Sequence, residues 1–361
     1  KENMPPSNLV FLLDVSGSMS YNNKLPLVKK SFKLLVQQLR EEDKVSIVVY
    51  AGSSGLVLSP TAGSDKNKII GALDKLHAGG STAGAAGIQL AYQTAQEAFI
   101  ENGNNRVILA TDGDFNVGTS SDSELVKLIE EKRKTGIALT ILGFGMGNLK
   151  DRKMEKIADN GNGNYAYIDN FEEAKKIFVK EIGGTLHTIA KDVKLQIEFN
   201  PAHVKEYRLI GYENRKLLDE DFNNDQKDAG DLGAGHTVTA LYEIVPASAN
   251  ETLASTIDDL KYQTRTLHPM AQSTPEWMTI KLRYKEPDKD NSKLLEVTTT
   301  DEGITLAQAS ENFKWSAAVA SFGMVLRDSQ YKGNADLNTV LDLAKKQLGK
   351  MSMDTEKSFW G

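Results

Sequence analysis

The chain has 361 residues, no cysteine and a formal net charge of −6, from 43 Lys and Arg against 49 Asp and Glu. The lack of cysteine excludes disulfides, zinc–thiolate sites and thiol nucleophiles. The mild acidity argues against nucleic-acid binding, which normally uses a basic face. No apolar run approaches the ~20 residues of a membrane-spanning helix, so we expect no transmembrane span in this chain.

The first half of the chain alternates between strand and helix patterns. Strands are predicted at 9–14, 44–50, 55–58 (a short edge strand), 106–111, 137–144 and 164–168. Helices are predicted at 24–40, 65–76, 85–100, 122–133, 149–158 and 172–183. This alternation is typical of an α/β fold with a doubly wound, mainly parallel, Rossmann-like sheet. We expect it to form a domain over residues 8–184.

The second half has a different pattern, with apolar and polar residues alternating as in half-buried antiparallel strands. Such strands are predicted at 192–199, 204–209, 237–245, 277–284 and 293–300, and helices at 308–328 and 336–348. We therefore expect a second domain over residues 185–361, a β-sandwich-like module that ends in two helices. The helix at 308–328 is so apolar that we expect it to be buried against a large surface.

Oxygen-bearing side chains follow two of the predicted parallel strands. The apolar run Leu9–Leu13 ends at Asp14, and Ser16 and Ser18 come directly after it. The strand at 106–111 is followed by Asp112, and the glycine-rich loop Gly79-Gly80-Ser81-Thr82 lies between the two. Ligands of open α/β sheets bind at the carboxyl ends of the strands. These three motifs therefore predict one site at that edge.

The three motifs, in this order, resemble the metal-ion-dependent adhesion site of von Willebrand factor type A domains. The resemblance covers about residues 8–183 and implies metal-binding roles for Asp14, Ser16, Ser18, Thr82 and Asp112, with the two aspartates often acting through bound water. Asp114 is a possible outer-shell ligand, although a solvated turn aspartate is the commoner role for such a residue.

The donor set favours a hard, oxygen-loving cation. Mg²⁺ takes six oxygen ligands near 2.1 Å, whereas tight Ca²⁺ binding needs more and longer-reaching oxygens. We therefore expect Mg²⁺, with Mn²⁺ as a readily exchanged surrogate and Ca²⁺ as a further possibility. The hydroxyls are neutral and the two carboxylates act partly at one remove, so the ion is left incompletely neutralised and a Glu or Asp of a partner protein can complete its coordination.

The second half also carries a resemblance. The stretches FNPAHVKEYRLIGYENR, KDAGDLGAGHTVTALYEIVP, LRYKEP and VASFGMVLRDSQY are similar to the region that follows the A domain in bacterial proteins of the YfbK type. The resemblance covers about residues 190–335. It implies an export or lipoprotein signal upstream of Lys1, and hence a place in the bacterial cell envelope, periplasmic or at the surface. The composition is equally compatible with the cytoplasm.

These observations predict a metal-dependent protein-interaction module of the adhesion type, not an enzyme. One alternative is an assembly factor that acts with a MoxR-type AAA ATPase. Another is a hydrolase that uses the ion as a Lewis acid. A third is self-assembly, in which an acidic loop such as 219–231 reaches the ion of a neighbouring copy.

Enzyme motifs are missing from the sequence. There is no P-loop, no G-x-S-x-G elbow and no His-x₃-His pair. The five histidines are scattered and are expected to be surface or capping residues, with His236 the one worth closer inspection because it enters a strand from a glycine-rich loop.

Overall fold

In the computed structural model the described residues are 4–51, 54–80, 84–113, 122–146, 150–180, 188–212, 216–249, 266–287 and 289–345. They form two compact units. The first comprises residues 1–193 together with 228–236 and 285–290, and the second comprises 194–227, 237–284 and 291–361.

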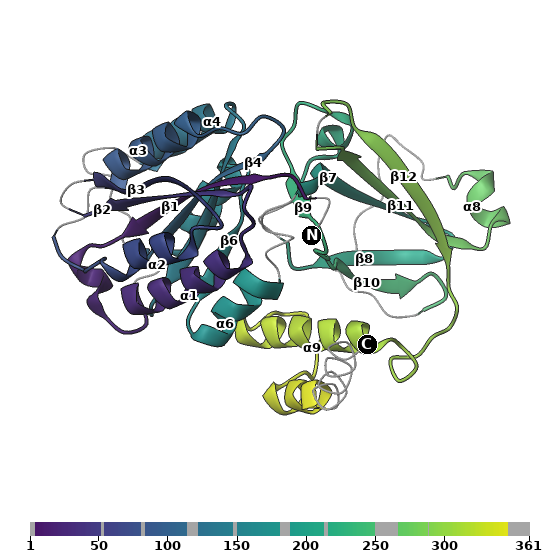
Figure 1. The fold of residues 1–361 in the computed structure, drawn as a ribbon. Helices are drawn as coiled ribbons and strands as arrows, with labels where there is room; N and C mark the ends of the chain where they lie inside the picture. Colours follow the sequence, from purple (N-terminus) through teal and green to yellow (C-terminus); the bar gives the residue numbers. More distant parts are fainter. Residues whose placement is uncertain are drawn as a thin grey trace. The chain divides into compact units, whose positions relative to one another are not determined.

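A six-stranded sheet forms the centre of the first unit (Figure 1). Its strand order is β3 (Ser54–Ala62), β2 (Lys44–Tyr50), β1 (Ser7–Asp14), β4 (Asn104–Thr111), β5 (Ile137–Phe144) and β6 (Tyr165–Ile168). Neighbouring strands are parallel except for β2 and β3, which are antiparallel. The predicted doubly wound, mainly parallel sheet is therefore confirmed.

Helices cover both faces of this sheet (Figure 1). One face carries α1 (Leu25–Gln38), α2 (Lys66–Asp74), α6 (Phe171–Lys175) and the π-helical segment η2 (Lys176–Lys180), and the other carries α3 (Gly84–Glu97), α4 (Asp122–Arg133) and α5 (Asp151–Asn160). The strand β1 serves both layers, because Leu9, Phe11 and Leu13 pack in the first core and Val10 and Leu12 in the second. Its continuous apolar sequence follows from this double burial.

The described residues of the second half form two sheets. A four-stranded sheet has the order β12 (Lys293–Thr300), β11 (Glu276–Lys285), β7 (Thr188–Phe199) and β9 (Gly230–Gly233), and β10 (Leu241–Pro246) pairs with β8 (Val204–Ile210). Short helical segments lie at η3 (Asp219–Asn223) and α8 (Pro269–Ser273). Phe199 of β7 contacts the rings of Tyr207 and Tyr242 on the smaller sheet. The expected β-rich region is present.

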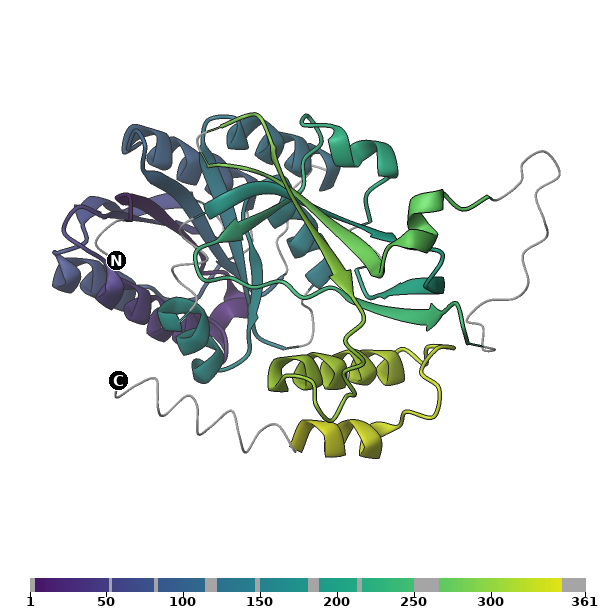
Figure 2. The same ribbon diagram turned by 90° about the vertical axis from the view of Figure 1, so that its right-hand side faces the viewer.

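Several details of this half differ from the prediction. The strand expected at 237–245 begins only at Leu241, and the sequence pattern does not predict β9. The first C-terminal helix is α9 (Glu311–Leu326), and residues 337–345 form a second helix beside it (Figure 2).

The expectation that the first C-terminal helix is deeply buried is wrong. Only Ala318 of α9 is buried, whereas Val319 is 54% exposed and Phe313 and Phe322 are nearly half exposed. A helix that is apolar on all sides can bury only the sides that meet a neighbour. Across the described residues, no helix combines the length and apolarity needed to cross a membrane.

Candidate metal centre

The candidate site lies where the strand order of the sheet changes direction. From β1 the chain crosses to β2 on one side, whereas β4 pairs with β1 on the other side. A crevice forms outside the strand ends at such a point. Asp14 is the last residue of β1, and Asp112 follows Thr111, the last residue of β4. The two predicted carboxylates therefore lie at the ends of neighbouring strands.

The carboxylate of Asp14 is held by three donors. The Ser16 backbone N–H donates to Oδ1 at 2.9 Å, and the Tyr50 and Thr111 hydroxyls donate to Oδ2 at 3.0 and 3.2 Å. Asp14 is 1% exposed, and this burial, reinforced by the nearby charge of Asp112, raises the pKa of its carboxyl above the ordinary value. Its side chain is thus fixed in position, and a cation close by would stabilise its ionised form.

The two predicted serines lie next to each other. Ser16 Oγ and Ser18 Oγ are 3.1 Å apart, with Ser16 buried and Ser18 exposed. Adjacent corners of a Mg²⁺ octahedron are about 3.0 Å apart, because each oxygen lies near 2.1 Å from the ion. The 3₁₀ helix η1 (Gly17–Ser20), which begins between the two serines, curls the chain at this point. The hydroxyl pair therefore fits two neighbouring ligand positions of such an ion.

The glycine-rich loop is tied to the serine loop through its backbone. Gly79 N–H donates to the Val15 carbonyl at 2.7 Å, and Gly17 N–H donates to the Gly80 carbonyl at 3.0 Å. Gly80 has a φ of +83°, which favours glycine. Thr82 and Asp114 lie outside the described residues, so the structure places the chain up to Gly80 beside the serines and no further.

A lysine that sequence reasoning missed completes the described part of the site. Lys24, at the start of α1, places its Nζ 2.8 Å from Asp112 Oδ2. Both side chains are largely buried. Tyr50 and Thr111 were also missed. Each ends a strand, which was the available signal, but their contacts with Asp14 depend on the pairing of the strands.

No described histidine is hydrogen-bonded to a residue of this site. His268 caps α8 by accepting from Met270 N–H at 3.2 Å, and His203 stacks on Trp277 and bonds to the Thr274 carbonyl. His236, at the turn after β9, is exposed. His187 lies outside the described residues.

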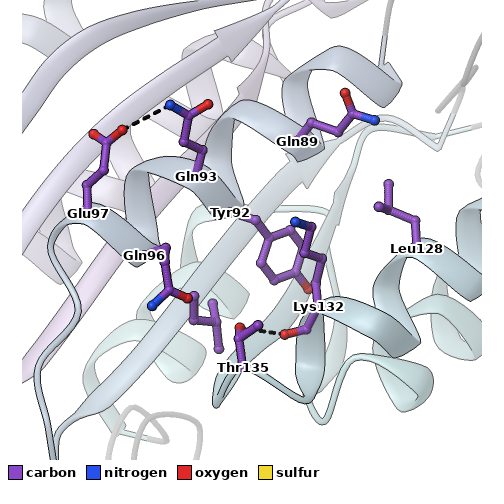
Figure 3. Close-up of a pocket in the computed structure, with 9 residues that line it drawn as sticks. Gln89, Tyr92, Gln93, Gln96, Glu97, Leu128, Lys132 and Thr135 are labelled. Carbon is purple, nitrogen blue, oxygen red and sulfur yellow. Dashed lines mark hydrogen bonds between the residues drawn. The ribbon is translucent and has the colours of Figure 1, made fainter.

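A hollow of about 500 Å³ lies between α3 and α4 (Figure 3). It is lined by Gln89, Gln96 and Lys132 around the ring of Tyr92. None of the predicted site residues lines it.

Comparisons with known proteins agree with both halves of the chain. The model of the von Willebrand factor type A domain matches residues 8–180, and the model described as "Uncharacterized protein YfbK, C-terminal" matches residues 184–360. Uncharacterized protein YfbK of Escherichia coli (strain K12) is 46% identical over 349 residues, which cover 97% of this chain and 60% of that protein. Uncharacterized protein sll0103 of Synechocystis sp. (strain ATCC 27184 / PCC 6803 / Kazusa) is 30% identical over 173 residues, or 48% of this chain and 40% of that protein.

A solved structure, von Willebrand factor type A from Catenulispora acidiphila, matches with a TM-score of 0.50 at 17% identity, covering 97% of this chain and 82% of its own. That likeness concerns the fold alone. This chain thus spans less than two thirds of either curated relative. It belongs to the proteins in which a von Willebrand factor type A domain is followed by the YfbK C-terminal region.

Proposed function

We propose that the A domain is a divalent-metal-dependent protein-interaction module. Asp14, Ser16, Ser18, Thr82 and Asp112 hold the ion, which is Mg²⁺ or its close substitute Mn²⁺, with Ca²⁺ a weaker fit, and Asp114 is a candidate for the outer shell. The observation that carries the proposal is the pair of serine oxygens, 3.1 Å apart, beside two buried carboxylates at the strand ends. A site of this kind suits an ion that keeps a position open for a partner.

The described residues of this site have different roles. The two hydroxyls are neutral ligands, and Asp14 is oriented by Tyr50, Thr111 and the Ser16 N–H. When bound, the ion supplies an electrophilic position that a Glu or Asp of the partner protein can fill. A charged and strongly directional contact of this kind gives specificity as well as affinity.

An interaction role suits the described residues better than hydrolysis. The groups that contact Asp14 are hydroxyls and backbone N–H, and they hold its carboxylate in place rather than leaving it available as a base. The partner is a protein with an exposed acidic side chain, and an AAA ATPase of the MoxR type is one candidate. We place the protein in the bacterial cell envelope, on the basis of its resemblance to the YfbK type.

Isothermal titration with Mg²⁺ and Mn²⁺ tests the metal site. Asp14→Ala and Ser16→Ala are expected to lose binding while keeping the far-UV circular dichroism spectrum of the parent. Ser20→Ala is the matched control, since Ser20 lies in η1, is exposed and has no proposed ligand role. Metal binding that persists in Asp14→Ala would contradict the proposed site.

A pull-down from envelope and soluble fractions, in Mg²⁺ and in EDTA, tests the interaction. A partner captured only in Mg²⁺, and lost with Asp14→Ala, supports the proposal, and its identity shows whether it is an ATPase. A partner captured equally in Mg²⁺ and EDTA would assign the interaction to another surface.

A further inference from the structure

The ammonium of Lys24 is built into the candidate metal site. Its Nζ lies 2.8 Å from Asp112 Oδ2, and the two side chains are 13% and 4% exposed. Exposed ion pairs contribute little and need not persist. This pair is largely shielded from solvent, so we expect it to persist and to change the electrostatic potential at the site.

The surrounding chain fixes the position of this lysine. Lys24 is the residue directly before α1, and its Nζ lies 5.4 Å from the centre of the Tyr21 ring. Gly145, directly after β5, leaves room for the lysine stem, because a Cβ at this position would lie 2.6 Å from Lys24 Cε. A separate hydrogen bond fixes the turn at Gly145, because the Tyr167 hydroxyl donates to the Gly145 carbonyl at 2.6 Å. The position of the ammonium is therefore specified by the fold.

The lysine changes the charge of the site. Asp14, Asp112 and Lys24 together carry one negative charge, so a divalent ion leaves this group with one positive charge. Without the lysine the formal charges of the two carboxylates and the ion would sum to zero, and an anionic ligand would meet a group without net charge instead of a positive one. At short range and partial burial, one unit of charge has a large effect on affinity.

We propose that Lys24 determines the specificity of the site, weakening metal binding but keeping the metal-loaded site cationic so that it selects a carboxylate ligand. This inference rests on the proposed function, because it concerns the same ion. It goes further because it gives a role to a residue outside the three motifs. Lys24 sets the balance between affinity for the metal and affinity for the acidic partner.

Lys24→Met removes the charge and keeps an unbranched stem over Gly145. Isothermal titration of the full chain is expected to show Mg²⁺ bound about tenfold more tightly than by the parent. Acetate then serves as a probe of the open position on the Mn²⁺-loaded protein, read as the fall in water-proton relaxation when it displaces bound water. Acetate is expected to bind more weakly to Lys24→Met than to the parent.

Two control variants test whether the effect comes from the charge at this position. Lys24→Arg keeps the charge and is expected to behave like the parent in both titrations. Lys30→Met removes an exposed lysine further along α1 and is expected to change neither. Should Lys24→Met fold poorly, Lys24→Gln makes the same charge change in a more polar side chain and is expected to give the same two shifts.

The outcomes separate the two proposals. Unchanged or weaker Mg²⁺ binding in Lys24→Met, with the parent binding Mg²⁺ and Asp14→Ala not, would overturn the role of Lys24 alone and leave it as a support for Asp112. A parent chain that binds no Mg²⁺ would overturn the metal site itself.

Discussion

Two tyrosines are buried in the same core layer but differ in the hydrogen bonds of their hydroxyls. Tyr50 and Tyr92 are 0% and 2% exposed, and both pack in the layer that contains α3. The Tyr50 hydroxyl donates to Asp14 Oδ2 at 3.0 Å. The Tyr92 hydroxyl has no partner among the described residues, and its ring lines the hollow between α3 and α4 (Figure 3).

We expect Tyr50→Phe to destabilise the protein and weaken its metal site. The change removes a hydrogen bond to a buried carboxylate, which contributes about 1–3 kcal/mol to the free energy of unfolding. It also frees the Asp14 side chain to leave its position, so Mg²⁺ affinity should fall. Urea unfolding followed by far-UV circular dichroism, and titration with Mg²⁺, measure the two effects.

Tyr92→Phe is the matched control for this prediction. Because the hydroxyl removed has no described partner, its loss should leave the free energy of unfolding unchanged or slightly higher. Mg²⁺ affinity should also be unchanged. Equal destabilisation by the two substitutions would show that the Tyr50–Asp14 bond is not what holds Tyr50 in place.

The site residues differ in how far the sequence reveals them. Asp14, Ser16 and Ser18 form one short motif at the end of an apolar strand, so their proximity is predictable. Tyr50 ends an equally apolar strand, and its role appears only when the register pairs it with Asp14. Lys24 is 88 residues from Asp112, and nothing local links the two. The metal itself stays a prediction.

At the scale of elements, the turn before β6 depends on a glycine that touches backbone. A Cβ at Gly163 would lie 1.8 Å from the Leu139 carbonyl oxygen of β5. Gly163 N–H also bonds to the Ala158 carbonyl, so the turn is held between α5 and β5. Because backbone cannot rotate aside as a side chain does, any larger residue must displace the strand.

We expect Gly163→Ala to loosen the edge of the sheet. Overpacking against backbone costs about 3 kcal/mol, and the loss should appear as faster hydrogen exchange in β6 and the adjoining part of β5. Gly71→Ala in α2 is the contrasting variant, since a Cβ there meets nothing within 4 Å. Its better helix propensity should add about 0.5–1 kcal/mol. Similar exchange in both variants would contradict the argument.

The elements that were predicted best are those that carry a strong local pattern. The strands of the parallel sheet have mainly apolar sequences, and their existence follows from that. The four residues of β9, Gly-Asp-Leu-Gly, have no strand propensity, and only their pairing with β7 makes them a strand. For α9 the composition indicates a helix, but burial depends on what surrounds it. The predicted boundary at residue 184 stays a prediction.

At the scale of the whole molecule, part of the second half of the sequence is joined to the A domain through buried charge. Residues 228–236, with β9, group with the first unit. There Asp231 accepts from the Asp192 N–H at 3.1 Å, and the fully buried Arg106 acts on it electrostatically. Lys285 Nζ lies 2.6 Å from Asp192 Oδ2, and the carboxylate of Asp228 forms an ion pair with Arg133.

Two carboxyls of this cluster have pKa values shifted in opposite directions. Burial, with the charges of Asp192 and Asp228, raises the pKa of Asp231 to about 6. Burial also acts to raise the pKa of Asp192, but the hydrogen bonds from Lys285 and the Ala229 N–H outweigh it and hold that pKa below its ordinary value. The folded chain therefore keeps a proton on Asp231 that the unfolded chain has already released above about pH 4.

The sign of the pH dependence follows from this difference. Between about pH 4 and 6 the folded state binds more protons at Asp231, so its contribution to stability falls as the pH rises and is lost above pH 6. Asp231→Asn removes this loss, because the amide oxygen still accepts from Asp192 N–H without a charge to bury. The variant should match the parent at pH 4 and exceed it by about 2–3 kcal/mol at pH 7.

Urea unfolding of the full chain at pH 4, 5, 6 and 7 measures this difference, and subtracting the parent cancels the titration of groups that do not interact with Asp231. Asp192→Asn is expected to change stability in the opposite direction, losing stability at neutral pH because its ionised form is paired with Lys285 in the folded state. If Asp231→Asn lowers stability at pH 7 instead, the ionised Asp231 is needed to balance the buried Arg106. In that case charge pairing within the cluster would help to hold residues 228–236 on the A domain. Otherwise the buried charge of Asp231 opposes this attachment.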